Sequence, residues 1–204
     1  MNKKLEYKYG YYVLITYHLI FLIICYFYTA FDNKESDCEK YIRLANDLEW
    51  FDLLGFGTKF IGFLIYPLVK LGFGYFFLTL LFSLISLKGF LIYYKLYFNN
   101  NQKRKINLLI IGWLFLPSFH FWTSFLSKDA IIFLMMALVI KAFETKNYKS
   151  ITLFIVVLAS FLIRPYAVIL ILTSCVFVYL FYSKERIQKK IAYTITLLAC
   201  FFIL

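Results

Sequence analysis

The chain has 204 residues, of which 63% are hydrophobic and only 16% are charged, and it carries a formal net charge of +11. Soluble domains contain about half apolar and about a quarter charged residues, so this composition excludes an ordinary soluble domain and favours an all-α polytopic membrane protein. The positive charge does not predict nucleic acid binding, because it lies in short clusters between apolar runs, as in loops beside an anionic membrane leaflet. These clusters contain Lys3, Lys4 and Lys8; Lys103, Arg104 and Lys105; and Lys184, Arg186, Lys189 and Lys190.

The apolar runs predict one transmembrane domain, residues 1–204, with about six to seven spans and short broken helices at the outer face. The first predicted span, residues 11–31, lacks a small-residue cleavage site, so we interpret it as a retained helix. Proline and glycine interrupt the next apolar region, which predicts a short helix at 60–71 and a full span at 75–96. The remaining apolar segments are residues 106–119, 130–143, 151–163, 166–182 and 191–204.

The positions of lysine and arginine predict the orientation of these helices in the cytoplasmic membrane. The N-terminus and the basic loops are expected on the cytoplasmic side. This orientation requires that residues 60–71 do not cross the bilayer and that the chain breaks at Arg164, because the following proline disfavours helix there. Residues 32–59 then form an outer loop, which contains seven of the eleven acidic residues: Asp32, Glu35, Asp37, Glu39, Asp47, Glu49 and Asp52.

The outer loop supplies the first candidate site residues. Ser36 and Glu39 have the spacing of a capping box, which predicts a helix start. Asp37 is a candidate catalytic carboxylate, and Tyr41 is a candidate binding residue one turn later on the same face. The alternative for Asp37 is that its charge only favours the helix N-terminus. The predicted helix lies on the outer membrane surface, with an apolar face made of Tyr41, Leu44, Ala45 and Leu48.

Two further breaks in the apolar pattern fall on the same predicted side. Ser127, Lys128 and Asp129 lie between two predicted spans, and Arg164 lies alone between two apolar runs. Charged groups so close to hydrocarbon usually have partners or a function, although capping alone would explain Asp129 and an ion pair with Asp129 would explain Arg164. We therefore predict an outer cavity with Asp37 and Asp129 as catalytic candidates. Its predicted substrate- or phosphate-binding residues are Arg164, Lys128, His120, Trp122 and Tyr41.

The sequence predicts no metal and no cofactor. No CxxC motif and no Cys/His spacing of the zinc or redox type is present. His18 falls in the middle of the first predicted span, where a hydrogen-bonded packing role is the more common interpretation of a histidine without a matching ligand. Lys88, inside the second full span, is expected to extend toward the cytoplasmic end.

Three segments carry a resemblance to a known group of proteins. They are GFGTKFIGFLIYPLVKLGFGYF, LPSFHFWTSFLSKDAIIF and LIRPY. Together they resemble multi-pass proteins of bacterial surface-polysaccharide clusters, which look like oligosaccharide repeat-unit polymerases and membrane glycosyltransferases of the C-type fold. The resemblance implies a catalytic acid in the first outer loop, where Asp37 stands, and an external arginine that holds a lipid diphosphate, where Arg164 stands. Such enzymes usually have more spans, so the sequence also fits a fragment or a half-size relative.

The expected function is that of a membrane glycosyltransferase or polysaccharide polymerase, which lies in the lipid bilayer and uses a polyprenyl-linked sugar donor at the outer face of the cytoplasmic membrane. Such glycosyl transfer needs a carboxylate that accepts a proton from the acceptor hydroxyl and cations that stabilise the departing phosphate. A transporter or flippase component is one alternative, although substrate binding near the midplane predicts more charge there. A non-catalytic assembly subunit of a polysaccharide system is the other.

Overall fold

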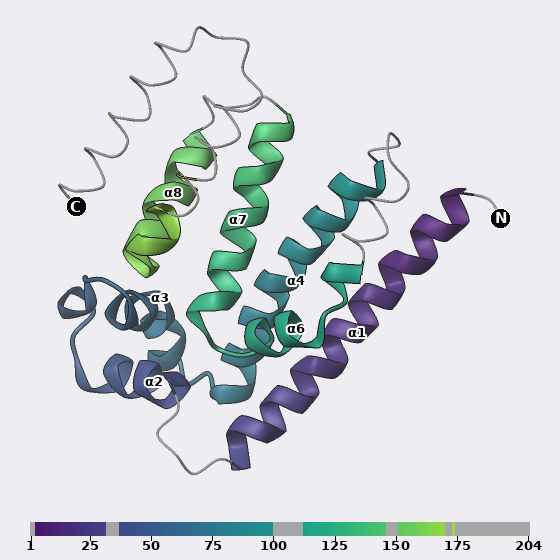
Figure 1. The fold of residues 1–204 in the computed structure, drawn as a ribbon. Helices are drawn as coiled ribbons and strands as arrows, with labels where there is room; N and C mark the ends of the chain where they lie inside the picture. The colour runs from purple at the N-terminus through teal and green to yellow at the C-terminus, as the bar shows by residue number, and fades with distance from the viewer. Residues whose placement is uncertain (1–2, 32–36, 100–111, 146–150, 170–172, 174–204) are drawn as a thin grey trace, which may run out of the picture.

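The structure, a computed structural model, describes residues 3–31, 37–99, 112–145, 151–169 and 173. The predicted spans 166–182 and 191–204 lie wholly or mostly outside these residues, as do Asp32, Ser36 and the basic loops near residues 103 and 184. The described residues form an all-helical bundle without strands (Figure 1). This confirms the predicted all-α class.

Two helices are long and apolar enough to cross a membrane. They are α1, Lys3–Phe31, and α4, Tyr75–Asn99, with candidate spans Tyr7–Thr29 and Tyr75–Phe98. A third candidate is the pair α6, Pro117–Thr123, and α7, Lys128–Glu144, which is bent by 113° at the break between them. The helix α8, Ile151–Ile163, is apolar but shorter. The described residues therefore contain two or three candidate spans.

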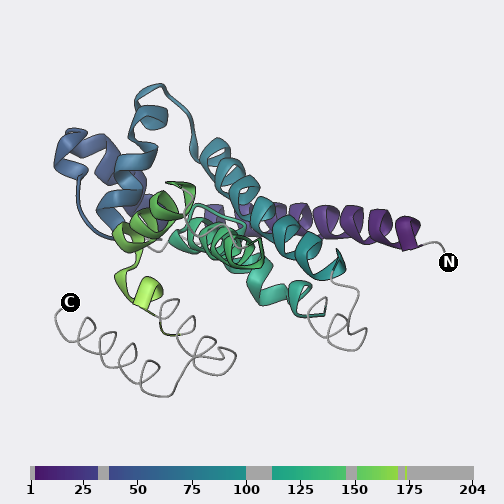
Figure 2. The ribbon, with the colours of Figure 1, turned by 90° about the horizontal axis from the view of Figure 1, so that it is seen from above.

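Between α1 and α4 the chain forms a compact helical cap, consisting of α2, Asp37–Asp47, the 3₁₀ turn Phe51–Leu53, and α3, Thr58–Lys70. Figure 1 places this cap at the end of the bundle where α1 ends and α4 begins, and Figure 2 shows it opposite the N-terminus. The α3 helix has only 13 residues. Both of its ends remain near this one end of the bundle, and that this segment does not cross the bilayer stays a prediction.

The boundaries of α3 follow from its glycines and its proline. Gly57 precedes the helix with φ +66°, and Gly72 follows it with φ +84°, a conformation that glycine adopts without strain. Pro67 lies inside the helix and cannot donate to the carbonyl of Phe63. That carbonyl instead accepts a hydrogen bond from the indole N–H of Trp50 at 3.1 Å. The helix thus continues through its proline because the cap supplies another donor.

The apolar face of α2 is covered by α3. Cys38, Tyr41 and Ala45 are buried in the same cluster as Ile61 and Ile65 of α3. At Gly62 of α3, an added Cβ would lie 3.6 Å from the Cβ of Leu44. This face therefore packs against protein, which differs from the prediction that α2 lies with it on the membrane surface.

The predicted segment 106–119 is not one continuous helix. Residues 112–114 are helical, Leu116 is extended, and α6 then starts at Pro117. Proline is favoured in the first turn of a helix and disfavours helix in the residue before it, so it both ends one helix and starts the next. The α6 helix then ends at Thr123, and the break before Lys128 bends the chain by 113° into α7.

Candidate functional site

Three chain segments meet at the end of the bundle that carries the cap. They are the start of α7, the end of α8 and the loop before α3. The N–H of Gly57 donates to the carbonyl of Leu162 at 2.8 Å and so fixes the loop to α8. An added Cβ at Gly57 would lie 3.6 Å from Nζ of Lys128 and 3.9 Å from the carbonyl oxygen of Ile163. The loop before α3 therefore lies close to both the start of α7 and the end of α8.

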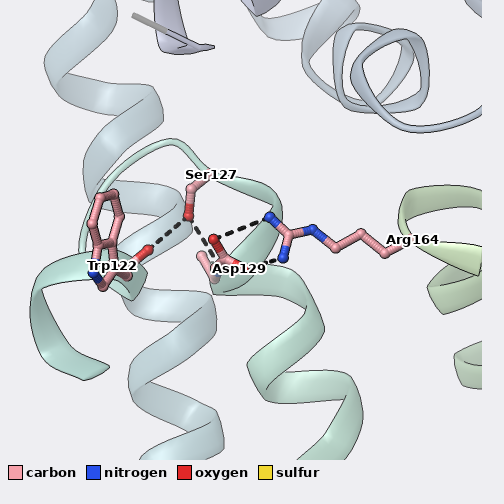
Figure 3. Close-up of polar contacts among 5 residues, drawn as sticks. Trp122, Ser127, Asp129 and Arg164 are labelled. Carbon is pink, nitrogen blue, oxygen red and sulfur yellow. Dashed lines mark hydrogen bonds and ion pairs between the residues drawn. The ribbon is translucent and has the colours of Figure 1, made fainter. Parts of the chain in front are cut away.

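Arg164 and Asp129 form a bidentate ion pair in this region (Figure 3). Nη1 of Arg164 lies 2.7 Å from Oδ1 of Asp129, and Nη2 donates to Oδ2 at 3.2 Å. The two side chains are 29% and 36% exposed, so solvent reaches the pair. Two parallel hydrogen bonds fix the plane of the guanidinium group and leave its other N–H donors open to a further acceptor.

Ser127 positions Asp129 for this pair. Its Oγ caps α7 by accepting from the N–H of Ala130 at 3.2 Å, and it donates to the carbonyl of Trp122 at 3.0 Å. Because Ser127 supplies the cap, the carboxylate of Asp129 does not have to serve as one. It lies in the first turn, where the helix dipole also favours a negative charge.

Arg164 is held at a break between two helical stretches. Its N–H still donates to the carbonyl of Ser160 at 2.8 Å, and its own carbonyl accepts from Ala167 at 3.0 Å. Pro165 begins the next helical stretch, residues 165–169. The guanidinium group also lies 5.7 Å from the ring of Tyr166, within cation–π range. The break predicted from the Arg164-Pro165 sequence is present.

Lys128 and Tyr41 lie beside the ion pair. Nζ of Lys128 donates to Oγ1 of Thr58 at 2.9 Å and lies 5.9 Å from the ring centre of Tyr41. Tyr41 is almost completely buried. Burial raises the pKa of its phenol, the charge of Asp37 raises it further, and Arg164 opposes the rise. Tyr41 therefore keeps its hydroxyl proton at neutral pH and lies within electrostatic range of Asp37, Asp129 and Arg164.

Of the two candidate carboxylates, Asp37 is more exposed to solvent than Asp129. It begins α2, and its side chain is 64% exposed. Its ion pair with Lys40 is long, at 3.8 Å, and joins two residues on the solvent side of one helix. The oxygens of Asp37 are thus available for proton transfer, whereas both oxygens of Asp129 are engaged by Arg164.

Trp122 shares a groove with Asp129 between α6 and α7. The groove has a volume of about 350 Å³ and is lined mainly by apolar side chains. Asp129 lies at the α7 start, and the groove follows α7 away from it through Ile132, Phe133 and Met136. Trp122 is 56% exposed. An ionic group at one end and an apolar channel beyond it suit an amphiphilic ligand.

His120 lies apart from Arg164 and Asp129, in contrast to the prediction that it borders the outer cavity. It is fully buried, and its Nδ1 lies 2.8 Å from Nδ1 of His18. Its Nε2 lies 2.7 Å from the carbonyl oxygen of Leu114. Both ring nitrogens are engaged inside the bundle, so neither is free for a phosphate.

The partners of the two histidines determine their hydrogen positions. The Leu114 carbonyl only accepts, so Nε2 of His120 carries a hydrogen. The Ser83 carbonyl also only accepts, and its oxygen lies 3.1 Å from Nε2 of His18. The hydroxyl of Ser86 lies 3.1 Å from the same nitrogen and donates to the carbonyl oxygen of Thr123 at 2.7 Å.

Two of these features have little signal in the sequence. The partner of His18 lies 102 residues away, so no local spacing connects the two histidines. Thr58, which binds Lys128, is an ordinary helix-start residue in the sequence. The positive φ of Gly57 was detectable in principle, because a glycine before a predicted helix is a common turn signal.

Within the described part of the chain, no group of three or more His, Cys, Asp or Glu side chains could hold a metal ion. Comparison of the chain with protein-family models, with curated proteins and with solved structures finds no match.

Proposed function

We propose that the chain is a membrane glycosyltransferase or polysaccharide polymerase that uses a polyprenyl-linked sugar donor. In this proposal it spans the cytoplasmic membrane about six to seven times, with its N-terminus in the cytoplasm and the cap at the outer face. The polysaccharide assignment comes from the resemblance described above. The geometry supports a second part of the proposal, that the chain binds a donor consisting of a lipid with an anionic headgroup.

One observation carries this proposal: Asp129, which lines one end of an apolar groove, is paired with Arg164. Arg164 has N–H donors left for a phosphate, and a planar guanidinium group binds phosphate through two bonds at once. Lys128 adds a second cation beside it. The apolar groove along α7 would receive the first isoprene units of the lipid. The diphosphate and the tail thus have adjacent sites of suitable chemistry.

The roles of the two carboxylates differ in this proposal. Asp37 accepts the proton from the acceptor hydroxyl, because it is exposed and its oxygens are accessible. Asp129 orients Arg164 and does not itself transfer a proton, since both of its oxygens face the guanidinium group. Lys128 and Arg164 stabilise the departing phosphate. Tyr41, buried between these groups, keeps a hydroxyl proton that it can donate as a hydrogen bond.

Binding of a polyprenyl diphosphate to the purified full-length chain in nanodiscs tests the donor site. We expect Arg164→Lys to weaken binding by about tenfold or more, because lysine keeps the charge but loses the two-bond geometry. Arg43→Lys is the matched control, since Arg43 is an exposed arginine on α2 and should bind the probe as the wild type does. Equal binding by the wild type and Arg164→Lys would contradict the proposed phosphate site.

Polymer formation in the native host tests the proton acceptor. We expect Asp37→Asn to retain polyprenyl diphosphate binding and insertion in the membrane but to abolish the polymer, because the amide cannot accept the proton. A strain with Asp37→Asn that forms polymer of normal amount and length would exclude this role.

A transporter component is the second candidate, and the buried His18–His120 pair favours it. The pair lies near the middle of α1, and transporters commonly bind substrates and coupling protons near the membrane midplane. Proton-coupled uptake of a sugar into proteoliposomes by the wild type, lost in His120→Asn and kept in Arg164→Lys, would favour this candidate over the first.

A further inference from the structure

A second concentration of charge lies at the end of the bundle opposite the cap, where α1 begins and α4 and α7 end (Figure 1). Four lysines from three helices line one open cavity of about 540 Å³ there. All four are exposed. We call this cavity the lysine pocket; its lysines are Lys8 of α1, Lys88 and Lys95 of α4, and Lys141 of α7.

The helix geometry explains why these lysines converge. Lys88 and Lys95 are seven residues apart and therefore lie on one face of α4, about 10 Å apart along its axis. The α4 helix lies between α1 and α7: the ring of Tyr94 lies 5.4 Å from that of Tyr7 on one side, and Gly89 faces the α7 backbone on the other. Lys8 and Lys141 thus approach the α4 face from its two flanks.

The lysine pocket has no compensating acid among its lining residues. Among the described residues, ion pairs join Lys40 to Asp37 and Arg164 to Asp129, and neither pair includes a lysine of this pocket. Glu144, one turn after Lys141, acts electrostatically on Tyr97 and does not line the pocket. Four like charges around one cavity repel each other, so an anion in the cavity would lower their electrostatic energy.

The depth of Lys88 narrows the choice of anion. Lys88 lies ten residues before Phe98, the end of the candidate span, which corresponds to about 15 Å of helix. A charge at that depth on the surface of a span is unfavourable unless it has a partner. Between the lysines the pocket presents Leu91 and Ile92, and Tyr12 at its α1 side is 65% exposed. Tyrosine and lysine around an apolar surface are typical of the membrane interface.

We propose that the lysine pocket binds the phosphate headgroup of an anionic phospholipid. The ammonium groups of Lys8, Lys88, Lys95 and Lys141 contact the phosphate oxygens, and an acyl chain lies on the apolar surface of α4. Basic pockets between transmembrane helices are a recurrent type of site for such headgroups. A free phosphate would use the same lysines but would gain nothing from Leu91 and Ile92. This site is independent of the proposed donor site at the other end of the bundle.

Native mass spectrometry of the full-length chain in a neutral detergent, titrated with phosphatidylglycerol or phosphatidylcholine, tests the proposal. We expect phosphatidylglycerol to bind in preference to phosphatidylcholine. The double variant Lys88→Gln/Lys95→Gln should bind phosphatidylglycerol about thirtyfold more weakly, from the energy that each lysine gains at an anionic headgroup. Lys88→Arg/Lys95→Arg should retain binding, because the charge is preserved.

A double control removes the same charge elsewhere. Lys59→Gln/Lys70→Gln alters two exposed lysines of α3, at the opposite end of the bundle, and should leave phosphatidylglycerol binding unchanged. The proposal would be overturned if phosphatidylcholine bound as tightly as phosphatidylglycerol, or if the α3 control lost as much phosphatidylglycerol binding as Lys88→Gln/Lys95→Gln. It would also be overturned if inorganic pyrophosphate bound through these lysines and phosphatidylglycerol were not preferred. That last result would assign the pocket to a free phosphate.

Discussion

His18 is a buried residue whose side chain contacts polar groups of two other helices. It links α1 to α4 through Ser83 and Ser86, and to α6 through His120. The hydroxyl of Ser86 also lies 2.7 Å from the carbonyl oxygen of Thr123 in α6. The carbonyl oxygen of Ser83 lies 3.1 Å from Nε2 of His18, so polar contacts join three helices inside the bundle at this residue.

Removal of one histidine should leave Nδ1 of the other without its partner inside the bundle. We expect His120→Ala to lower the free energy of unfolding by about 2–4 kcal/mol, from the lost hydrogen bonds and the cavity that it leaves. His18→Ala should have a similar effect. The double variant should cost less than the sum of the two, with a coupling energy of about 1 kcal/mol or more. Denaturant unfolding in detergent micelles measures these values.

Ser118→Ala is the control for this cycle, because Ser118 is an exposed residue of the same short helix. It should change the stability by about 0.5 kcal/mol at most. Strictly additive effects of His18→Ala and His120→Ala would show that the two rings do not interact.

At the scale of elements, α4 and α7 approach each other closely at Gly89. A Cβ added at Gly89 of α4 would lie 2.9 Å from Cδ1 of Phe133 and 3.1 Å from the Cα of Leu134. The side chain of Phe133 can turn away, but the backbone of α7 at Leu134 cannot move without separating the helices. Small residues permit such close approach between helices in membranes.

A branched side chain at Gly89 should therefore separate α4 from α7. We expect Gly89→Val to lower the free energy of unfolding by about 2–3 kcal/mol, since its methyl groups overlap the α7 backbone. Gly112→Val provides the comparison, because no atom lies within 4 Å of a Cβ at Gly112. If both variants unfold at the same denaturant concentration, the close contact between α4 and α7 is not present in solution.

At the scale of the whole molecule, the two ends of the bundle differ in character. One end carries the acidic cap, with Asp37 and the Arg164–Asp129 pair, and the other carries the lysine pocket. Lysine and arginine are enriched on the cytoplasmic side of membrane proteins. The lysine pocket is accordingly expected at the cytoplasmic face and the cap at the outer face.

Cysteine labelling of intact cells measures this orientation, after replacement of the four native cysteines. We expect an impermeant reagent to label Lys59→Cys at the start of α3 and to label Thr145→Cys after α7 only in permeabilised cells, because the two exposed positions lie at opposite ends of the bundle. Labelling of Thr145→Cys alone would reverse the orientation. Equal labelling of both positions in intact cells would mean that no membrane separates the two ends.

Among the described residues, the sequence by itself determined most of the helices and several of their ends. The segment 151–163 has the same bounds in the structure, and the predicted segment 130–143 lies within α7, Lys128–Glu144. These features are local: apolar runs of sufficient length, prolines, glycines and capping serines act on neighbouring residues. The break at Arg164 and its pairing with Asp129 were likewise accessible, because isolated charges in apolar surroundings require partners.

Only the tertiary structure decided which faces of these helices meet. The apolar residues of α4 are spread around its whole circumference, so its sequence does not show that Ser83 and Ser86 face His18 while Lys88 faces outward. The rotation of each helix about its axis is set by the side chains that interlock across the interface. For that reason His120, expected beside Arg164, lies instead against His18, and Lys88 belongs to a pocket shared with α1 and α7.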